Sequence, residues 1–148
     1  MKPILCLDFD GVIHSYTSGW KGARNITDTP VKGALEFIIK AMGYFEVNIF
    51  SSRSHQWGGR RAMKRWVESE LYSYLAKEEP DLFNLEDPFK DGQDCALSLA
   101  QSYSDSIKFP KHKPAAMVSI DDRAVQFTGE WPDLENLKTF KPWNKKGV

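Results

Sequence analysis

Cysteine and histidine are scarce in this chain of 148 residues, which contains two cysteines and three histidines. Cys6 and Cys95 lie far apart in the sequence, and neither the cysteines nor the histidines show the spacing of a zinc site. We therefore expect neither a disulfide framework nor a metal site built on sulfur and imidazole. Cys6 falls inside an apolar run, which indicates a buried free thiol in a reducing compartment, the cytoplasm.

A net charge and long hydrophobic runs are also missing. The 20 Lys and Arg side chains balance 20 Asp and Glu, so the chain as a whole has no charge that would attract nucleic acid or anionic lipid. No stretch is apolar over the length needed to cross a bilayer, and the N-terminal residues reach a carboxylate too soon for a signal peptide. We expect one domain over residues 1–148, with no membrane partner and no evident obligatory protein partner.

Short apolar strands alternate with amphipathic helices along the chain. Residues 4–9 contain a continuous apolar run, which is typical of a strand buried on both faces of a parallel sheet. A helix is predicted over 31–42, where apolar residues recur every three or four positions between Pro30 and Gly43. The other predicted elements are a strand over 45–50, helices over 60–75 and 95–103, and strands within 106–109, 116–121 and 137–140.

This alternation predicts an α/β fold, a Rossmann-like three-layer αβα sandwich around a central parallel sheet of about five strands, with no separate cap domain. A loop is expected over 13–30. Residues 78–94 contain seven acidic side chains, two prolines and a glycine, which indicates an exposed acidic loop or a small lid. In such a sheet, ligands bind beyond the carboxyl ends of the strands.

Acidic side chains follow two of the predicted strands. Asp8 and Asp10 share a direction because alternate strand residues point the same way, and Gly11 permits a turn behind them. Asp121 and Asp122 end a later strand, so three or four carboxylates would converge at one edge of the sheet. Crowded carboxylates need a cation or a shared proton at neutral pH. Oxygen ligands at this density suit a hard divalent cation, Mg²⁺ above all.

Hydrogen-bond donors are expected at the same edge. Ser51 follows one predicted strand, and Lys113 precedes another. Together with Mg²⁺ and backbone amides, a hydroxyl and an ammonium group would surround a phosphoryl group, whose transfer depends mostly on positioning and charge neutralisation. An aspartate can serve as the nucleophile and form an aspartyl phosphate. The pattern therefore indicates phosphoryl transfer.

Four segments carry a family resemblance: DFDGV near the N-terminus, IFSSR after a strand, a Lys-Pro pair before a strand, and IDDRA near the end. In this order they resemble the four signature motifs of the haloacid dehalogenase superfamily, over nearly the whole chain. The segments GVIHSYTSGWKGA, FSSRS and IDDRAVQFTGEW are similar to those of its small capless, phosphatase-like members in bacteria and bacteriophages.

The resemblance implies a role for each acidic residue. Asp8 would be the nucleophile that attacks phosphorus, and Asp10 would be the general acid and then the general base. The carboxylates of Asp8 and Asp122 and the backbone carbonyl of Asp10 would bind Mg²⁺. Asp121 would lie behind these ligands.

The resemblance also implies which groups hold the phosphoryl oxygens. Ser51 would donate a hydrogen bond to them, and Lys113 would neutralise the nucleophile and the transferring charge. Lys108 and Lys111 compete for the role of Lys113. We favour Lys113 because Pro114 suits the first turn of a helix, which would place the lysine at the start of that helix.

Further residues are candidates for substrate contact. The segment over 13–30 would be the short flap hairpin of the family, in which Trp20 either contacts substrate or packs against Tyr16. Residues 53–65 include five basic side chains and no acidic one, which indicates either a solvated helix face or a surface that attracts an anionic substrate. The candidates near the site are Gly11, Trp20, Ser52, Arg53 and His55.

The sequence thus predicts a Mg²⁺-dependent phosphatase that works through an aspartyl phosphate on Asp8. Its substrate would be a phosphoester, either a small molecule or a nucleic-acid terminus. One alternative is a phosphotransferase that uses the same site. Another is a non-catalytic module that binds phosphate, which is disfavoured because Asp10 is present and only chemistry needs a proton-transfer group there.

Overall fold

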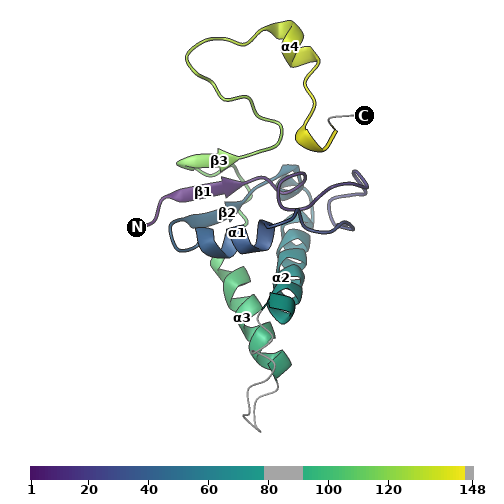
Figure 1. Cartoon of the computed structure of the whole chain (residues 1–148), viewed down its shortest axis with the longest axis vertical. Coiled ribbons are helices and arrows are strands. Elements are labelled where there is room, and N and C mark those ends of the chain that lie inside the picture. The colour runs from purple at the N-terminus through teal and green to yellow at the C-terminus, as the bar shows by residue number, and fades with distance from the viewer. Residues whose placement is uncertain (79–91, 146–148) are drawn as a thin grey trace.

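Three parallel strands form the central sheet of the computed structural model, which describes residues 1–78 and 92–145 (Figure 1). In the spatial order β2-β1-β3, the strands are β2 (Glu46–Ile49), β1 (Ile4–Leu7) and β3 (Val118–Ile120). Leu5 in the central strand pairs with Val47 on one side and with Val118 on the other. Because all three strands run in the same direction, their carboxyl ends lie at one edge of the sheet.

The prediction of about five strands is wrong: the sheet formed by the described residues has three. Within 106–109, a single residue, Lys108, pairs with β2, through backbone hydrogen bonds to Val47 at 3.0 Å and from Ile49 at 2.8 Å. The next donor in this register would be the N–H of residue 110. That residue is Pro110, which has no N–H, so the pairing ends there.

The strand predicted over 137–140 is also wrong. This segment contains the end of α4 (Leu134–Lys138) and the turn after it. The side chain of Asp133 caps this helix by accepting a hydrogen bond from the N–H of Glu135 at 2.8 Å. Such a cap stabilises a helical turn by about 1 kcal/mol, whereas a strand would need a neighbouring strand to pair with.

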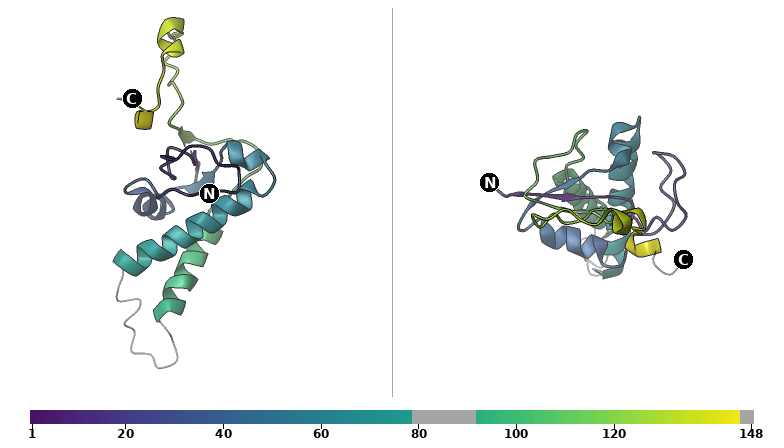
Figure 2. Two further views of the ribbon diagram at one scale, coloured as in Figure 1. Left: turned by 90° about the vertical axis from the view of Figure 1, so that its right-hand side faces the viewer. Right: turned by 90° about the horizontal axis from the view of Figure 1, so that it is seen from above.

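The longer helices match the predicted ones with shifted ends. They are α1 (Ala34–Ala41), α2 (Gly59–Glu78) and α3 (Gly92–Ser106). α1 starts after residue 31 because the N–H of Val31 donates to the carbonyl of Ile13 at 2.8 Å and Gly33 adopts a left-handed φ of 82°. α2 and α3 extend beyond their predicted ranges and pack along each other, side by side in both views (Figures 1 and 2).

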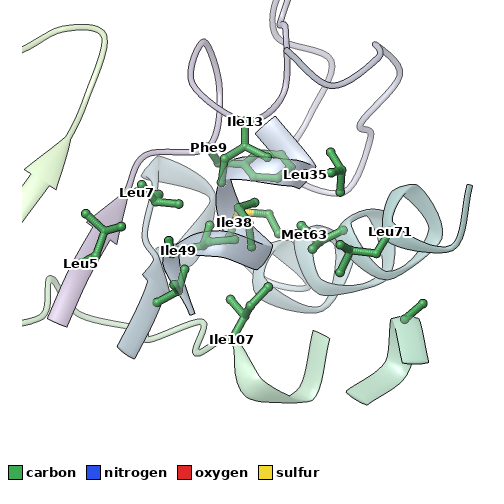
Figure 3. Packing of buried hydrophobic residues seen from close by; sticks show 14 of the residues in the cluster. Leu5, Leu7, Phe9, Ile13, Leu35, Ile38, Ile49, Met63, Leu71 and Ile107 are labelled. Carbon is green, nitrogen blue, oxygen red and sulfur yellow. The ribbon is translucent and has the colours of Figure 1, made fainter. Parts of the chain in front are cut away.

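Buried apolar side chains from the sheet and the helices form one core (Figure 3). Leu7 and Ile49 come from strands, Ile38 comes from α1, and Met63 and Leu71 come from α2; each is at most 1% exposed. Burying a side chain of this size contributes about 1.5–3 kcal/mol. The core therefore fixes β1 and β2, and with them the positions of the residues that follow these strands.

The segment over 13–30 is a closed loop rather than a two-stranded hairpin. A single antiparallel bridge joins His14 to Pro30, and the N–H of Ser15 donates to the carbonyl of Thr29 at 3.0 Å. We call residues 15–29 the flap loop.

The acidic loop or lid predicted over 78–94 falls mostly on residues outside the described ranges. Among the described helices, none combines the length and the apolar character needed to cross a membrane.

After β3 the chain leaves the body of the molecule, carries α4 at its far end and returns toward the loop that follows β1 (Figures 1 and 2). We call residues 123–142 the C-terminal loop. It exposes large apolar side chains, including Phe127 (57%) and Trp131 (87%). Its return ends in the short helix η3 (Trp143–Lys145), where the indole Nε1–H of Trp143 donates to the carbonyl of Gly11 at 2.7 Å.

Candidate active site

Three carboxylates meet at the carboxyl ends of β1 and β3. Asp8 follows β1 directly, and Asp121 and Asp122 follow β3 directly. The backbone N–H of Asp8 donates to the carbonyl of Ile120 at 2.9 Å, which holds the two strand ends together. One carboxylate oxygen from each aspartate lies within 4.8 Å of the other two. The parallel pairing thus gathers acidic residues that are more than a hundred positions apart in the sequence.

Burial and the neighbouring carboxylates of Asp121 and Asp122 raise the pKa of Asp8 from 3.8 to about 8. The backbone N–H of Phe9 donates to Asp8 Oδ1 at 2.8 Å and opposes this rise. With no cation beside it, Asp8 therefore holds a proton at neutral pH. A divalent cation among the three carboxylates would replace that proton and leave Asp8 ionised.

The surroundings of Asp122 fit a cation. Its side chain is 3% exposed, and among the described residues no donor reaches its buried Oδ1. A buried carboxylate oxygen without a partner is costly. Gly11 lies against the same carboxylate with a φ of 83°, and a Cβ at position 11 would overlap the carboxylate of Asp122. An all-oxygen set of this kind suits Mg²⁺.

Asp10 faces cationic and hydrogen-bonding partners instead of other carboxylates. Its Oδ2 accepts from Arg53 Nε at 2.8 Å, and its Oδ1 accepts from an Arg53 terminal nitrogen at 3.1 Å. His14 Nδ1 lies 2.9 Å from the same Oδ1. Burial raises the pKa of Asp10, but the hydrogen bonds from His14 and Arg53 outweigh it and hold the pKa below its ordinary value. The expected metal contact through its backbone carbonyl stays a prediction.

His14 is a buried positioning residue. Its side chain is 1% exposed, and the backbone N–H of Asp28 donates to its Nε2 at 3.1 Å. Because Nε2 accepts, the ring proton of the neutral form is on Nδ1, where it points to Asp10. The ring also stacks on Phe9 and meets Trp66 edge to face, with centroids 5.6 and 5.5 Å away. The spacing of the histidines argued against a metal role for His14 and indicated no other role.

Arg53, a candidate substrate contact near the site, is fully buried. Besides its fork to Asp10, it donates to backbone carbonyls of the flap loop, those of Gly22 at 2.9 Å and Ala23 at 3.0 Å. The ring of Trp20 covers the guanidinium at 4.7 Å and is 45% exposed. Arg53 therefore joins the flap loop to Asp10, and Trp20 packs on its guanidinium.

Ser51 begins the short helix η1 (Ser52–His55) at the end of β2. Its Oγ accepts from the N–H of Arg53 at 3.0 Å, and its own N–H donates to Ser54 Oγ at 3.0 Å. The Ser51 hydroxyl proton has no acceptor among the described residues, so it is available to a ligand. Ser51 and the carboxylates share a cavity of about 420 Å³, which is lined by Asp8, Asp10, Tyr16, Phe50, Ser51, Ser52, Asp121, Asp122 and Arg123.

The structure separates the three candidate lysines. Lys108 forms an ion pair with Glu46 at 2.9 Å, at the opposite end of β2 from the carboxylates. Lys111 lines a different cavity. Lys113 is exposed and does not line the carboxylate cavity. No helix begins at Pro114, so the reason for favouring Lys113 is wrong; the segment before β3 is irregular.

Arg123 is a cation at the site that was not among the predicted residues. It lines the carboxylate cavity, and its Nε lies 3.9 Å from Asp122 Oδ2. Its place directly after the two aspartates was the available signal. His55, a candidate substrate contact, contacts the ring of Phe50 at 5.4 Å but lines a neighbouring cavity.

Comparisons with protein-family models, with curated proteins and with solved structures find no match for this chain. The resemblance to the haloacid dehalogenase superfamily therefore rests on the sequence motifs alone. The chemistry of the site has to be argued from its own residues.

Proposed function

We propose that the protein is a Mg²⁺-dependent phosphatase that hydrolyses phosphomonoesters through an aspartyl phosphate on Asp8. The observation that carries this proposal is the meeting of three carboxylates beside Ser51. Among the described residues, one buried oxygen of Asp122 has no donor and the hydroxyl proton of Ser51 has no acceptor. Acidic side chains that are merely solvated at a surface need neither a shared cation nor a neighbouring hydroxyl. Phosphoryl transfer uses both, because the cation neutralises the phosphoryl charge and the hydroxyl donates a hydrogen bond to its oxygens.

Asp8 would form the new bond to phosphorus while the bond between phosphorus and the alcohol oxygen breaks. The departing oxygen would take a proton from Asp10. In the second step, water would attack phosphorus, Asp10 would take a proton from that water, and the bond from Asp8 to phosphorus would break. Inorganic phosphate would leave, and both aspartates would return to their starting states.

The surroundings of Asp10 suit the two proton transfers that it would carry out. The hydrogen bonds from His14 and Arg53 favour the ionised form that the second step requires. The first step requires a proton on Asp10, and the negative phosphoryl group beside it would raise its pKa on binding. His14 and Arg53 would keep the carboxylate aimed at the cavity in both steps.

The phosphoryl oxygens would be held by the Ser51 hydroxyl and by Arg123, which both line the carboxylate cavity, and by Lys113 if the irregular segment before β3 brings it closer. Asp8, Asp121 and Asp122 would hold Mg²⁺, which supplies positive charge to the transferring group and lets Asp8 ionise. We include Asp121 among these ligands because its carboxylate lies with the other two.

The test is the release of phosphate from p-nitrophenyl phosphate by the wild type and by Asp8→Asn, each with and without Mg²⁺. We expect turnover that needs both the metal and Asp8, with at least a thousandfold loss in the variant, the scale seen when a nucleophile is removed. Glu36→Gln is the matched control, because Glu36 lies exposed on α1 and pairs with Lys40.

Equal turnover by the wild type and Asp8→Asn would contradict the proposal. A wild type that releases no phosphate, and whose melting temperature is unchanged by Mg²⁺ with beryllium fluoride, would also contradict it. Transfer of the phosphoryl group to an added alcohol in preference to water would identify a phosphotransferase instead.

A further inference from the structure

A strongly basic surface lies beside the carboxylate cavity. One cavity of about 630 Å³ is lined by Arg60, Arg61, Lys64 and Lys111 together with Trp57. Another, of about 490 Å³, is lined by Arg24, Arg61 and Arg65, again with Trp57. The two cavities share Trp57 and Arg61, so they form one continuous surface around this tryptophan. We call Arg24, Trp57, Arg60, Arg61, Arg65 and Lys111 the Trp57 surface.

Most cations of the Trp57 surface have no carboxylate partner in the part of the chain that the structure describes. Lys64, at its margin, pairs with Asp105 at 2.7 Å. The other cations have no carboxylate partner among the described residues; Arg60 donates to the carbonyl of Phe109 at 3.4 Å. Five cations without a described carboxylate partner are thus concentrated in one region of a chain whose net charge is zero, which creates a local potential for binding anions.

The side chain of Trp57 is exposed to solvent and is not part of the hydrophobic core. It is 82% exposed, and the guanidinium of Arg24 lies over its ring at 4.7 Å. Gly58 makes room for this stack, because a Cβ at position 58 would lie 2.6 Å from Arg24 Cδ. An exposed ring between arginines is the arrangement on which nucleic-acid bases stack while the cations bind the phosphates.

The Trp57 surface continues directly from the site. Ser51 and Ser52 line the carboxylate cavity, whereas Ser54 and His55 line the first basic cavity. A nucleic-acid strand whose end lies at Asp8 would therefore pass η1 and reach Trp57, through a cavity lined by no acidic side chain of the described residues.

We propose that the Trp57 surface binds single-stranded nucleic acid and that the phosphate at the end of that strand is the substrate. This inference rests on the proposed function and names its substrate class. A small phosphoester would fill the carboxylate cavity and leave the neighbouring cations unused. An acidic protein would use the cations but would not need an exposed, stacked tryptophan. A single strand supplies both repeated phosphates and flat bases.

The first test measures binding of a fluorescent twelve-residue oligothymidylate by anisotropy at several salt concentrations. The charge variant is Arg61→Gln with Arg65→Gln, and Lys32→Gln with Lys40→Gln removes two exposed charges elsewhere. We expect the first pair to reduce the slope of log K against log[salt] by about 1.4, since each phosphate contact in a single strand contributes about 0.7. The second pair should leave binding unchanged. Trp57→Ala should weaken binding by about fivefold or more.

The second test compares two substrates. Phosphate release from oligothymidylate carrying a 3′- or a 5′-phosphate should fall about tenfold or more in kcat/KM in the charge variant, as expected for two lost charged contacts. Turnover of p-nitrophenyl phosphate by the same variant should stay at the wild-type rate, because neither arginine lines the carboxylate cavity.

Several outcomes would overturn the inference. Equal weakening by both charge pairs, or equal affinity for polyglutamate, would identify a general attraction to polyanions. Equal affinity for duplex DNA and no effect of Trp57→Ala would show that bases do not stack there. Active enzyme that binds no oligonucleotide would refute the substrate class alone. Bound oligonucleotide with no phosphate released from it or from p-nitrophenyl phosphate, and no stabilisation by Mg²⁺ with beryllium fluoride, would refute the proposed function and the assignment of the strand's end as substrate.

Discussion

At the scale of single residues, Asp8 and Asp10 show how two neighbouring carboxylates acquire opposite properties. They lie two positions apart, yet the pKa of Asp8 is raised to about 8 and that of Asp10 is lowered. Asp8 lies in buried surroundings beside other carboxylates, whereas Asp10 accepts hydrogen bonds from His14 and Arg53. Without a cation, Asp8 is therefore protonated and Asp10 ionised, so attack by Asp8 would need a cation to displace the proton from its carboxylate.

The raised pKa of Asp8 predicts a pH-dependent stability. Asp8 keeps its proton up to about pH 8 in the folded protein but loses it near pH 3.8 when unfolded. Between these values unfolding releases a proton, so the free energy of unfolding should fall as pH rises. In metal-free protein, thermal melts from pH 5 to pH 8 should therefore show a steeper decline for the wild type than for Asp8→Asn.

Mg²⁺ supplies the check on this explanation. It should raise the melting temperature of the wild type more at pH 8 than at pH 5, because at pH 5 the proton on Asp8 competes with the cation. Other groups titrate in both proteins, so the difference between wild type and Asp8→Asn is the quantity to compare. Identical pH slopes in the two proteins would show that Asp8 does not hold the proton.

At the scale of elements, Arg53 couples η1, the flap loop and the residues after β1. Its side chain is 0% exposed and donates to Asp10 and to the carbonyls of Gly22 and Ala23. Lysine cannot reproduce a planar fork. We expect Arg53→Lys to lower kcat for p-nitrophenyl phosphate about tenfold or more, the scale of a lost charged hydrogen bond. The acidic limb of the pH profile should move to higher pH, because Asp10 loses a group that lowers its pKa.

Arg65→Lys is the control for this variant, because Arg65 lies on α2 at the Trp57 surface and does not line the carboxylate cavity. It should retain the wild-type rate and pH profile. A purely structural effect of Arg53→Lys would lower the melting temperature and kcat but leave the acidic limb in place. That result would remove Arg53 from its positioning role toward Asp10.

The parts of the candidate site that follow from strand geometry could be predicted from the sequence. Strand alternation and parallel pairing place Asp8, Ser51 and Asp122 at the same sheet edge, as the cavity that they share bears out. The contacts of Arg53 and His14 were not predictable in this way. Arg53 reaches Asp10 across 43 positions, and its burial depends on how the flap loop folds over it. No periodicity encodes such a contact.

The two predicted strands that do not form, within 106–109 and 137–140, are also explained by contacts that the sequence pattern does not encode. The apolar residues of 106–109 and 137–140 fit a strand pattern, but pairing depends on backbone donors and on a neighbouring strand. Pro110 removes the donor that would extend the first pairing, and the Asp133 cap favours a helix near the second. Composition and alternation therefore predicted the α/β class correctly and overestimated the number of strands.

At the scale of the whole molecule, the C-terminal loop closes back onto the residues that follow β1. It leaves the sheet after β3 and extends away from the rest of the molecule (Figure 1). Its far end is held by Trp143, whose indole N–H donates a hydrogen bond to the carbonyl of Gly11. Gly11 in turn lies against Asp122. The C-terminal loop therefore ends at the turn after β1 that shapes the carboxylate site.

Trp143→Phe tests whether this tie stabilises the site. The variant keeps an aromatic ring and loses the indole N–H, so we expect the free energy of unfolding to fall by about 0.5–1.5 kcal/mol. Amide exchange at Gly11 and in the C-terminal loop should become faster, because opening the loop then costs less.

Trp131→Phe is the matched control: Trp131 is 87% exposed, and no hydrogen bond of its indole is described. If both variants melt and exchange alike, the hydrogen bond to Gly11 does not hold the C-terminal loop. If only Trp143→Phe is affected, and Mg²⁺ binds it more weakly, the end of the chain helps to fix the carboxylates that would hold the metal.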